Sequence, residues 1–189
     1  VEERLVEAAR EALARLQPAV LETARAPVPG VLYNRRTIKA DGMVEINFPY
    51  PRPDDGFTFS PVDDELTILR FRDERGIVAA LANFGCQPVT GTDRVPEGMR
   101  HLSADYPSHL REELGRAWHC PVLFTLGAAG DTVPANRQGD CRQRIGRVLA
   151  DTAALAERRF RPEPEARLAA VCRPVGAAAH EAFDPVGAP

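Results

Sequence analysis

An almost unbroken apolar run, IVAALANF at residues 77–84, is the strongest structural signal in this chain of 189 residues. Such a short run is typical of a strand that is buried on both faces of a sheet. A second apolar run, PVLFTL, occupies residues 121–126, and the apolar spacing between the two runs predicts a helix from about Asp105. The order strand, helix, strand predicts a β-α-β unit whose two strands are adjacent, central and parallel.

Regular structure is also predicted on both sides of this unit. Residues 65–71 read as a further strand, joined to the first apolar run by a turn at 73–76, and residues 142–160 read as a long helix. One more strand is expected at 168–171, and an amphipathic helix at the start of the chain ends at Pro18. These patterns predict an α/β fold with a mostly parallel sheet and helices packed on its faces.

A long irregular segment, rich in proline and glycine, is predicted at residues 24–62. Segments of this kind inside a domain are usually functional or disordered. The length predicts one domain, residues 1–172, followed by a loop-like tail at 173–189. We expect this domain to be cut at its N-terminus and at its C-terminus, because the first helix has neither an initiator Met nor a capping residue. Aromatic residues are scarce in disordered chains, and five of them argue against disorder in the irregular segment: Tyr33, Phe48, Tyr50, Phe57 and Phe59.

The composition argues against several classes of function. The net charge is −3, Lys39 is the only lysine and basic residues form no block, so we expect no nucleic-acid partner. We expect no transmembrane segment, since no apolar stretch is long enough, and the chain shows no signal peptide, which leaves its localisation unknown. The four cysteines form no C-x-x-C pair and are predicted to be isolated, reduced thiols: Cys86, Cys120, Cys141 and Cys172.

Candidate site residues follow from the predicted parallel strands. The carboxyl ends of such strands meet at one edge of the sheet, where ligands bind in open α/β folds. We therefore expect Gln87, Gly127 and Asp131, together with Arg35, to cluster at this edge. The small residues after Gly127 suit either tight packing or close approach to a ligand, and they lack the signatures of a phosphate loop and of a nucleophile elbow.

Three other polar features leave alternatives open. The pair Arg35 and Arg36 either clamps an anion or polarises a carbonyl, or it forms surface ion pairs. Asp105 and Asp131 are candidate functional carboxylates, with loop or helix capping as the alternative. Cys86 would need a nearby base to act as a nucleophile, and the histidines of this chain match no cysteine-protease signature.

Five segments, in order, resemble the N-terminal catalytic domain of the neutral/alkaline ceramidases and their bacterial relatives. They are VPGVLYNRR at 28–36, KADG at 39–42, NFGCQPVT at 83–90, LSADYP at 102–107 and LFTLGAAGD at 123–131. The resemblance covers most of residues 1–172. It implies a zinc-dependent amidohydrolase that cleaves the amide of ceramide, or of a related lipid amide, to a fatty acid and a sphingoid base. Zinc would polarise the carbonyl and lower the pKa of its bound water.

The resemblance also assigns roles to individual positions. Gln87 stands where the family has a histidine zinc ligand, and the other ligands would lie outside residues 1–189. We therefore expect the isolated chain not to bind zinc and to be inactive. The resemblance implies a catalytic site at Arg35, Gly127 and Asp131, where Gly127 replaces a family serine. It implies substrate binding, to a lipid-like small molecule, by Asn34, Arg35 and Asp105. The alternatives are a non-catalytic binding domain that has lost its zinc site, and a thiol enzyme that uses Cys86.

Overall fold

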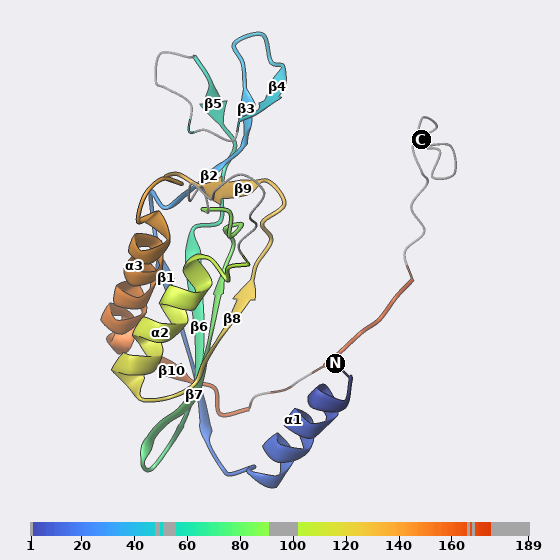
Figure 1. Cartoon of the computed structure of the whole chain (residues 1–189), viewed down its shortest axis with the longest axis vertical. Helices are drawn as coiled ribbons and strands as arrows, with labels where there is room; N and C mark the ends of the chain where they lie inside the picture. Colours follow the sequence, from blue (N-terminus) through green and yellow to red (C-terminus); the bar gives the residue numbers. More distant parts are fainter. Residues whose placement is uncertain are drawn as a thin grey trace.

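A five-stranded mixed sheet forms the centre of the structure, a computed structural model that describes residues 2–47, 50, 56–90, 102–165, 167 and 169–174. β7 (Gly76–Phe84) and β8 (Val122–Leu126) run parallel, whereas the other neighbouring strands of this sheet pair antiparallel. The adjacent parallel pair is therefore confirmed, but the prediction of a mostly parallel sheet is wrong, and β8 lies at the edge of the sheet instead of its centre. The strand order is β10 (Arg161–Pro162), β1 (Val20–Pro27), β6 (Glu65–Asp73), β7 (Gly76–Phe84) and β8 (Val122–Leu126) (Figure 1).

Local geometry explains the antiparallel strands. In the turn between β6 and β7, Asp73 Oδ1 accepts hydrogen bonds from the backbone N–H groups of Arg75 and Gly76, at 2.7 and 3.1 Å. A turn this short can join only antiparallel strands. The second half of β1 lies inside the segment predicted to be irregular. The sequence did not reveal this strand, because its core-facing residues include Ala24 and Ala26, which give a weak apolar alternation.

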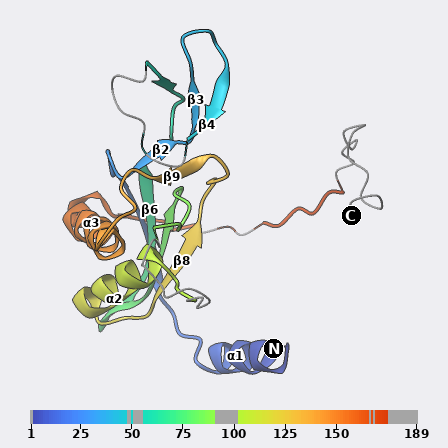
Figure 2. The ribbon, with the colours of Figure 1, turned by 45° about the horizontal axis from the view of Figure 1, so that its top comes forward.

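Two helices cover one face of the sheet: α2 (Tyr106–Trp118) and α3 (Cys141–Leu155), which continues as the 3-10 helix η2 (Ala156–Arg159) (Figure 2). Ile68 and Phe84 from the sheet and Leu149 from α3 are fully buried in the core between these layers. The two helices approach closely at Gly146, where an added Cβ would lie 2.5 Å from the Cβ of His109. The predicted helices are thus confirmed, but in the described part of the chain both pack on the same face.

Two smaller sheets extend the structure above the central one. β2 (Leu32–Asn34) pairs with β9 (Thr132–Pro134), and β3 (Arg36–Ile38) lies between β4 (Val44–Ile46) and β5 (Thr58–Phe59). The segment predicted to be irregular therefore holds four short strands in addition to the second half of β1. Strands of two or three residues are too short to show an alternating apolar pattern, which is why the sequence did not reveal them.

The remaining predictions concern the ends of the chain and the aromatic residues. Residues 169–171 are not in a strand, so the strand expected at 168–171 is not confirmed, and Leu168 itself lies outside the described residues. Most of the predicted tail at 173–189, and Phe48, also lie outside them. The ring of Tyr33 contacts those of Tyr50 and Phe59, with centroids 5.0 and 5.9 Å away. This packing agrees with the prediction that these aromatic residues are ordered.

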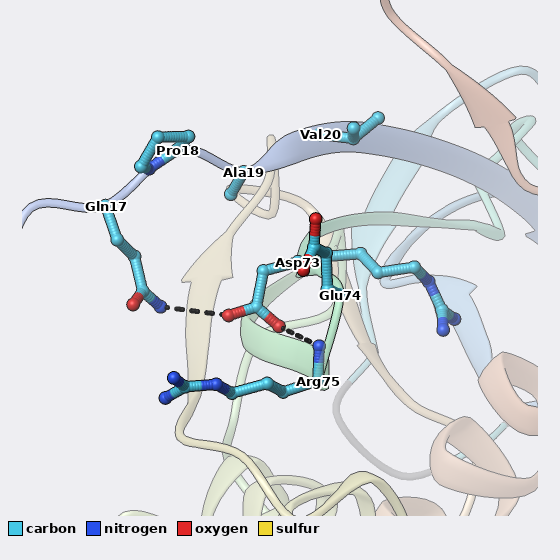
Figure 3. A pocket seen from close by; sticks show the side chains of 8 residues that line it. Gln17, Pro18, Ala19, Val20, Asp73, Glu74 and Arg75 are labelled. Carbon is cyan, nitrogen blue, oxygen red and sulfur yellow. Dashed lines mark hydrogen bonds between the residues drawn. The ribbon is translucent and has the colours of Figure 1, made fainter.

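The first helix, α1 (Glu2–Ala14), is confirmed, but none of its residues is buried. The segment that follows it passes beside the β6–β7 turn, and the side chain of Gln17 donates a long hydrogen bond of 3.4 Å to Asp73 (Figure 3). A cavity of about 670 Å³ lies between this segment and the turn. This cavity is at the opposite end of the sheet from the carboxyl ends of β7 and β8 (Figure 1), so it is separate from the predicted site.

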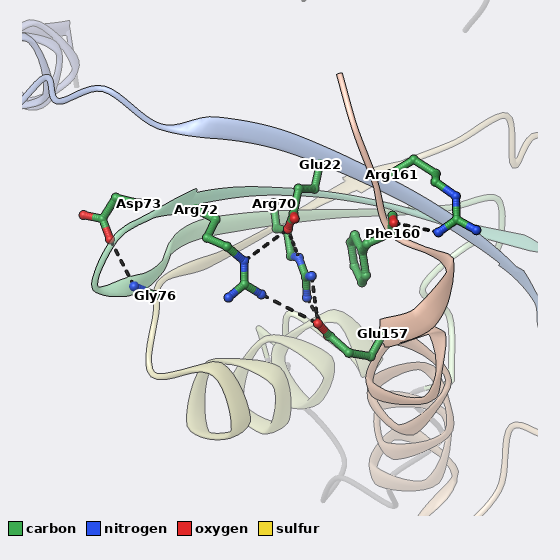
Figure 4. A network of polar contacts seen from close by, with 8 residues as sticks. All are labelled: Glu22, Arg70, Arg72, Asp73, Gly76, Glu157, Phe160 and Arg161. Atoms are coloured by element: carbon green, nitrogen blue, oxygen red, sulfur yellow. Dashed lines mark hydrogen bonds and ion pairs between the residues drawn. The ribbon is translucent and has the colours of Figure 1, made fainter. Parts of the chain in front are cut away.

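A buried arginine links the sheet to the end of α3. Arg70, on the core side of β6, has a side chain only 3% exposed, and it donates two hydrogen bonds to Glu157, at 2.6 and 2.8 Å, and one of 2.5 Å to Glu22 (Figure 4). Its guanidinium carbon lies 3.6 Å from the ring centroid of Phe160. Burial alone would lower the pKa of Arg70, but these two carboxylates outweigh that effect and raise it. The network fixes β1, β6 and η2 to one another.

Candidate functional site

The loops that follow β7 and β8 lie side by side, as the parallel pairing requires. The backbone N–H of Gln87 donates to the carbonyl oxygen of Thr132 at 3.3 Å, and the hydroxyl of Thr132 donates to the carbonyl oxygen of Gly85 at 2.6 Å. These two bonds join the β7 loop to the beginning of β9. The prediction that the two strand-end segments are neighbours is therefore confirmed by direct contacts.

The β2–β3 segment brings a third component to the same place. β2 pairs with β9, and the backbone N–H of Arg35 donates to the carbonyl oxygen of Asp131 at 2.8 Å. The guanidinium of Arg35 donates to the carbonyl oxygen of Gly130 at 2.9 Å. The side-chain amide of Asn34 donates to the carboxylate of Asp131, also at 2.8 Å. Residues far apart in the sequence thus hold one another in a fixed arrangement.

A cavity of about 330 Å³ opens between these loops. Arg35 and Gln87, which the sequence singled out from separate motifs, both line it. A guanidinium is a forked, permanently charged donor, and a glutamine side chain offers both an amide donor and a carbonyl acceptor. The cavity can therefore bind a carbonyl, an amide or an anion. Its lining residues are Arg35, Gln87, Val89, Ala129, Gly130, Thr132 and Val133.

Asp105 does not line the cavity but binds the end of the loop that carries Gln87. Its buried carboxylate accepts hydrogen bonds from the backbone N–H of Thr90 at 2.9 Å, from the hydroxyl of Thr90 at 2.7 Å and from the backbone N–H of Tyr106 at 2.7 Å. Asp105 thus caps α2 and fixes the end of the loop that carries Gln87. These contacts favour the capping alternative for Asp105, while its role in substrate binding stays a prediction.

Gly127 is placed by packing at the end of β8. A Cβ at this position would lie 3.2 Å from the Cα of Gly85 and 3.3 Å from the side-chain oxygen of Asn83. Gly127 does not line the cavity, whereas Gly130 in the same loop does. The geometry favours the tight-packing alternative for Gly127, and its catalytic role stays a prediction.

The environment of Cys86 does not suit a nucleophile. The thiol is buried, and this burial, with a smaller contribution from the charge of Asp105, raises the pKa of Cys86 to about 12. The carbonyl oxygen of Cys86 accepts a short hydrogen bond from the hydroxyl of Tyr106, which fixes the backbone beside Gln87. Because a thiolate is the reactive form, Cys86 serves as part of the core near neutral pH.

The described residues do not fit a zinc ion at Gln87. Within the part of the chain that the structure describes, no group of three or more His, Cys, Asp or Glu side chains could hold a metal. Gln87 instead shares its cavity with the guanidinium of Arg35, whose charge opposes a second cation.

The sequence missed Thr132 as a member of the site. Thr132 is 4% exposed, lines the cavity and links the two strand-end loops. Its only signal was its position directly after Asp131, because β9 is too short for a periodic pattern. Val89 and Gly130 lie inside motifs that the sequence had identified, although neither had been chosen as a site residue.

Comparisons with known proteins show a shared fold. No protein-family model matches the sequence, and no curated protein does. The structure resembles neutral ceramidase from Pseudomonas aeruginosa, with a TM-score of 0.56, 18% identity and coverage of 80% of this chain and 24% of that chain. It also resembles a ceramidase complexed with C2, with a TM-score of 0.56, 18% identity and coverage of 78% and 23%. The chain thus spans about a quarter of these proteins and has a ceramidase-like scaffold. None of the helices in its described part is long and apolar enough to cross a membrane.

Proposed function

We propose that this chain forms the polar substrate-binding part of a hydrolase related to the neutral ceramidases, and that Arg35 and Gln87 bind the amide head of a lipid-like substrate. One observation carries the proposal: Arg35 and Gln87 come from separate ceramidase-like motifs and line one cavity on a ceramidase-like scaffold. A forked guanidinium would bind the amide carbonyl oxygen, and the side chain of Gln87 would bind the amide N–H.

The surface beside this cavity suits the apolar part of such a substrate. β3 follows Arg35 directly, and the backbone N–H of Asn47, just after β4, donates to the carbonyl oxygen of Arg35 at 2.7 Å. Figure 1 shows the small sheet of β3, β4 and β5 projecting from the body at this point. Large apolar side chains on it are exposed, among them Val44, Ile46 and Phe59. A polar cavity next to an apolar surface matches the two halves of an amphiphile.

Binding of a short-chain ceramide, below its micelle-forming concentration, tests this proposal. Arg35→Ala should weaken binding by at least tenfold, because a hydrogen bond to a charged group contributes about 1.5–3 kcal/mol. The matched control is Arg36→Ala, since Arg36 is the next residue, carries the same charge and points to solvent. Arg35→Lys keeps the charge without the fork and should also weaken binding. Equal affinities for the two alanine variants, or no binding by the parent chain, would contradict the proposal.

A second candidate function is binding without hydrolysis. It is favoured by Gln87, which stands where the ceramidase resemblance implies a histidine, and by the poor fit of this cavity to zinc. Fatty-acid release from the same ceramide, measured with and without added zinc, tests whether this chain also hydrolyses what it binds. We expect this chain to bind the ceramide and to release no fatty acid. Zinc-dependent release that is lost in Gln87→Ala would instead place the metal at this cavity.

A further inference from the structure

The central sheet has one open face, and half of this face is mainly apolar. The cross-strand partners on the side away from α2 and α3 form two neighbouring rows, and in the described part of the chain neither helix covers them (Figure 2). Leu123 is 60% exposed and Phe71 is 40% exposed. We call this surface the open face, and it consists of Leu21, Phe71 and Ala79 in one row and Thr23, Leu69, Leu81 and Leu123 in the next, in which Thr23 is the one polar member.

The apolar character is confined to the half of the sheet at which α1 is attached. Leu21 lies at the start of β1, directly after the segment that leads from α1. Towards the other end of the same face, the cross-strand row is polar and consists of Arg25, Thr67, Asn83 and Thr125. A uniform solvent-facing sheet surface would not be expected to show this division, whereas a surface that is partly covered would.

α1 has a matching apolar stripe whose side chains are largely exposed. Leu5, Ala9, Leu13 and Leu16 recur at helical spacing, and Leu5, Leu13 and Leu16 are 65%, 66% and 76% exposed. A helix of 13 residues is marginal on its own in water and gains most of its stability from packing of its apolar face. Within the described residues, the chain therefore contains two exposed apolar surfaces that are joined by a short segment.

The dimensions allow these two surfaces to meet. α1 is about 20 Å long at 1.5 Å per residue, and β6 spans roughly 30 Å. The connecting residues 15–19 reach up to about 17 Å, which exceeds the separation of about 10 Å between packed layers. The long Gln17–Asp73 hydrogen bond, beside a cavity, links this connection to the β6–β7 turn (Figure 3). The length of the connection allows α1 to lie over the sheet.

We propose that α1 docks its Leu5–Leu16 stripe on the open face of its own sheet, giving a third layer opposite α2 and α3. The short connection makes docking within the chain more favourable than docking on a second copy, because it keeps α1 at a high effective concentration near the face. The arrangement is independent of the proposed function, since it involves the far end of the sheet from Arg35 and Gln87.

Thiol labelling of the open face tests this arrangement. In a chain with Cys172→Ser, which removes the exposed thiol, Ala79→Cys provides a probe, while the other three cysteines are buried. Leu5→Asp with Leu13→Asp should raise the labelling rate at position 79 by at least tenfold, because charged residues oppose docking. Glu3→Gln with Glu7→Gln, on the opposite side of α1, is the matched control and should leave the rate unchanged. Equal rates in the parent and the Asp variant would overturn the proposal.

Dilution and cross-linking distinguish the chain's own face from that of a second copy. Docking within the chain predicts a labelling rate that stays constant over a hundredfold dilution, whereas a rate that rises on dilution would overturn the proposal. In the pair Ala9→Cys and Ala79→Cys, mild oxidation should give a monomer with an internal disulfide, and Glu7→Cys with Ala79→Cys should cross-link at least tenfold more slowly. Covalent dimers as the main product would also overturn it.

Discussion

Replacement of Asp105 should lower the free energy of unfolding by more than the loss of one surface hydrogen bond would. Asp105→Ala leaves the buried N–H and hydroxyl of Thr90 without their acceptor, at about 1–3 kcal/mol each, and removes the cap of α2, at about 1 kcal/mol. The expected loss in the free energy of unfolding is therefore about 3–7 kcal/mol, a large part of the 5–15 kcal/mol typical of a domain. Asp105→Asn keeps one carboxyl-like acceptor and should fall between the parent and the alanine variant.

The backbone of Asp105 provides an internal control. Its φ of 57° and ψ of −150° lie in a region that favours glycine, so alanine keeps a strain of about 1–2 kcal/mol that Asp105→Gly relieves. Glycine should thus be about 1 kcal/mol less destabilising than alanine, although both lose the same hydrogen bonds. Urea unfolding followed through Trp118, the only tryptophan, measures these differences. A loss below about 0.5 kcal/mol for Asp105→Ala, or equal losses for glycine and alanine, would refute this reasoning.

Three further predictions concern the contact between α2 and α3, the ion pair of Arg70 and the reactivity of the cysteines. Gly146→Ala should lower the free energy of unfolding by about 1–3 kcal/mol, because the new Cβ would push α2 away from α3. The cost of this displacement exceeds the gain of about 1 kcal/mol in helix propensity. A variant that is more stable in urea than the parent would contradict the close approach of the two helices. Arg70 holds the pKa of Glu157 below its ordinary 4.5, so Glu157→Gln should cost about 0.5–1 kcal/mol at pH 7, since the Glu157 side chain is 54% exposed. That cost should vanish as the pH falls through the lowered pKa, and a pH-independent difference in unfolding would refute the ion pair. At pH 8, iodoacetamide should alkylate the exposed Cys172 and leave Cys86 intact, as peptide mass spectrometry would show; equal modification would contradict a thiol pKa of about 12.

The local patterns of the sequence were sufficient for the main helices, the strand pair β7 and β8 and the site that follows them. A 13-residue helix and a nine-residue strand are long enough for their apolar periodicity to be read directly. Parallel strands end at the same edge of the sheet, so the sequence alone was enough to place Gln87 beside the loop that ends at Asp131. Gln87 lines one cavity with Ala129 and Gly130 of this loop, in agreement with this inference.

The tertiary structure alone decided how the other strands pair and what each site residue does. A strand's direction relative to its neighbour depends on the path of the chain between them, and short strands such as β2 and β9 are stable only because they pair with each other. Burial likewise separates residues that the sequence had made equal candidates for the site. Asp105 is enclosed by Thr90 and Tyr106, whereas Arg35 lines the cavity. The sequence determined which side chains could do chemistry, since residue type sets charge and hydrogen-bonding capacity. Only the three-dimensional packing determined which of them face an open space, because that depends on contacts between segments far apart in the chain.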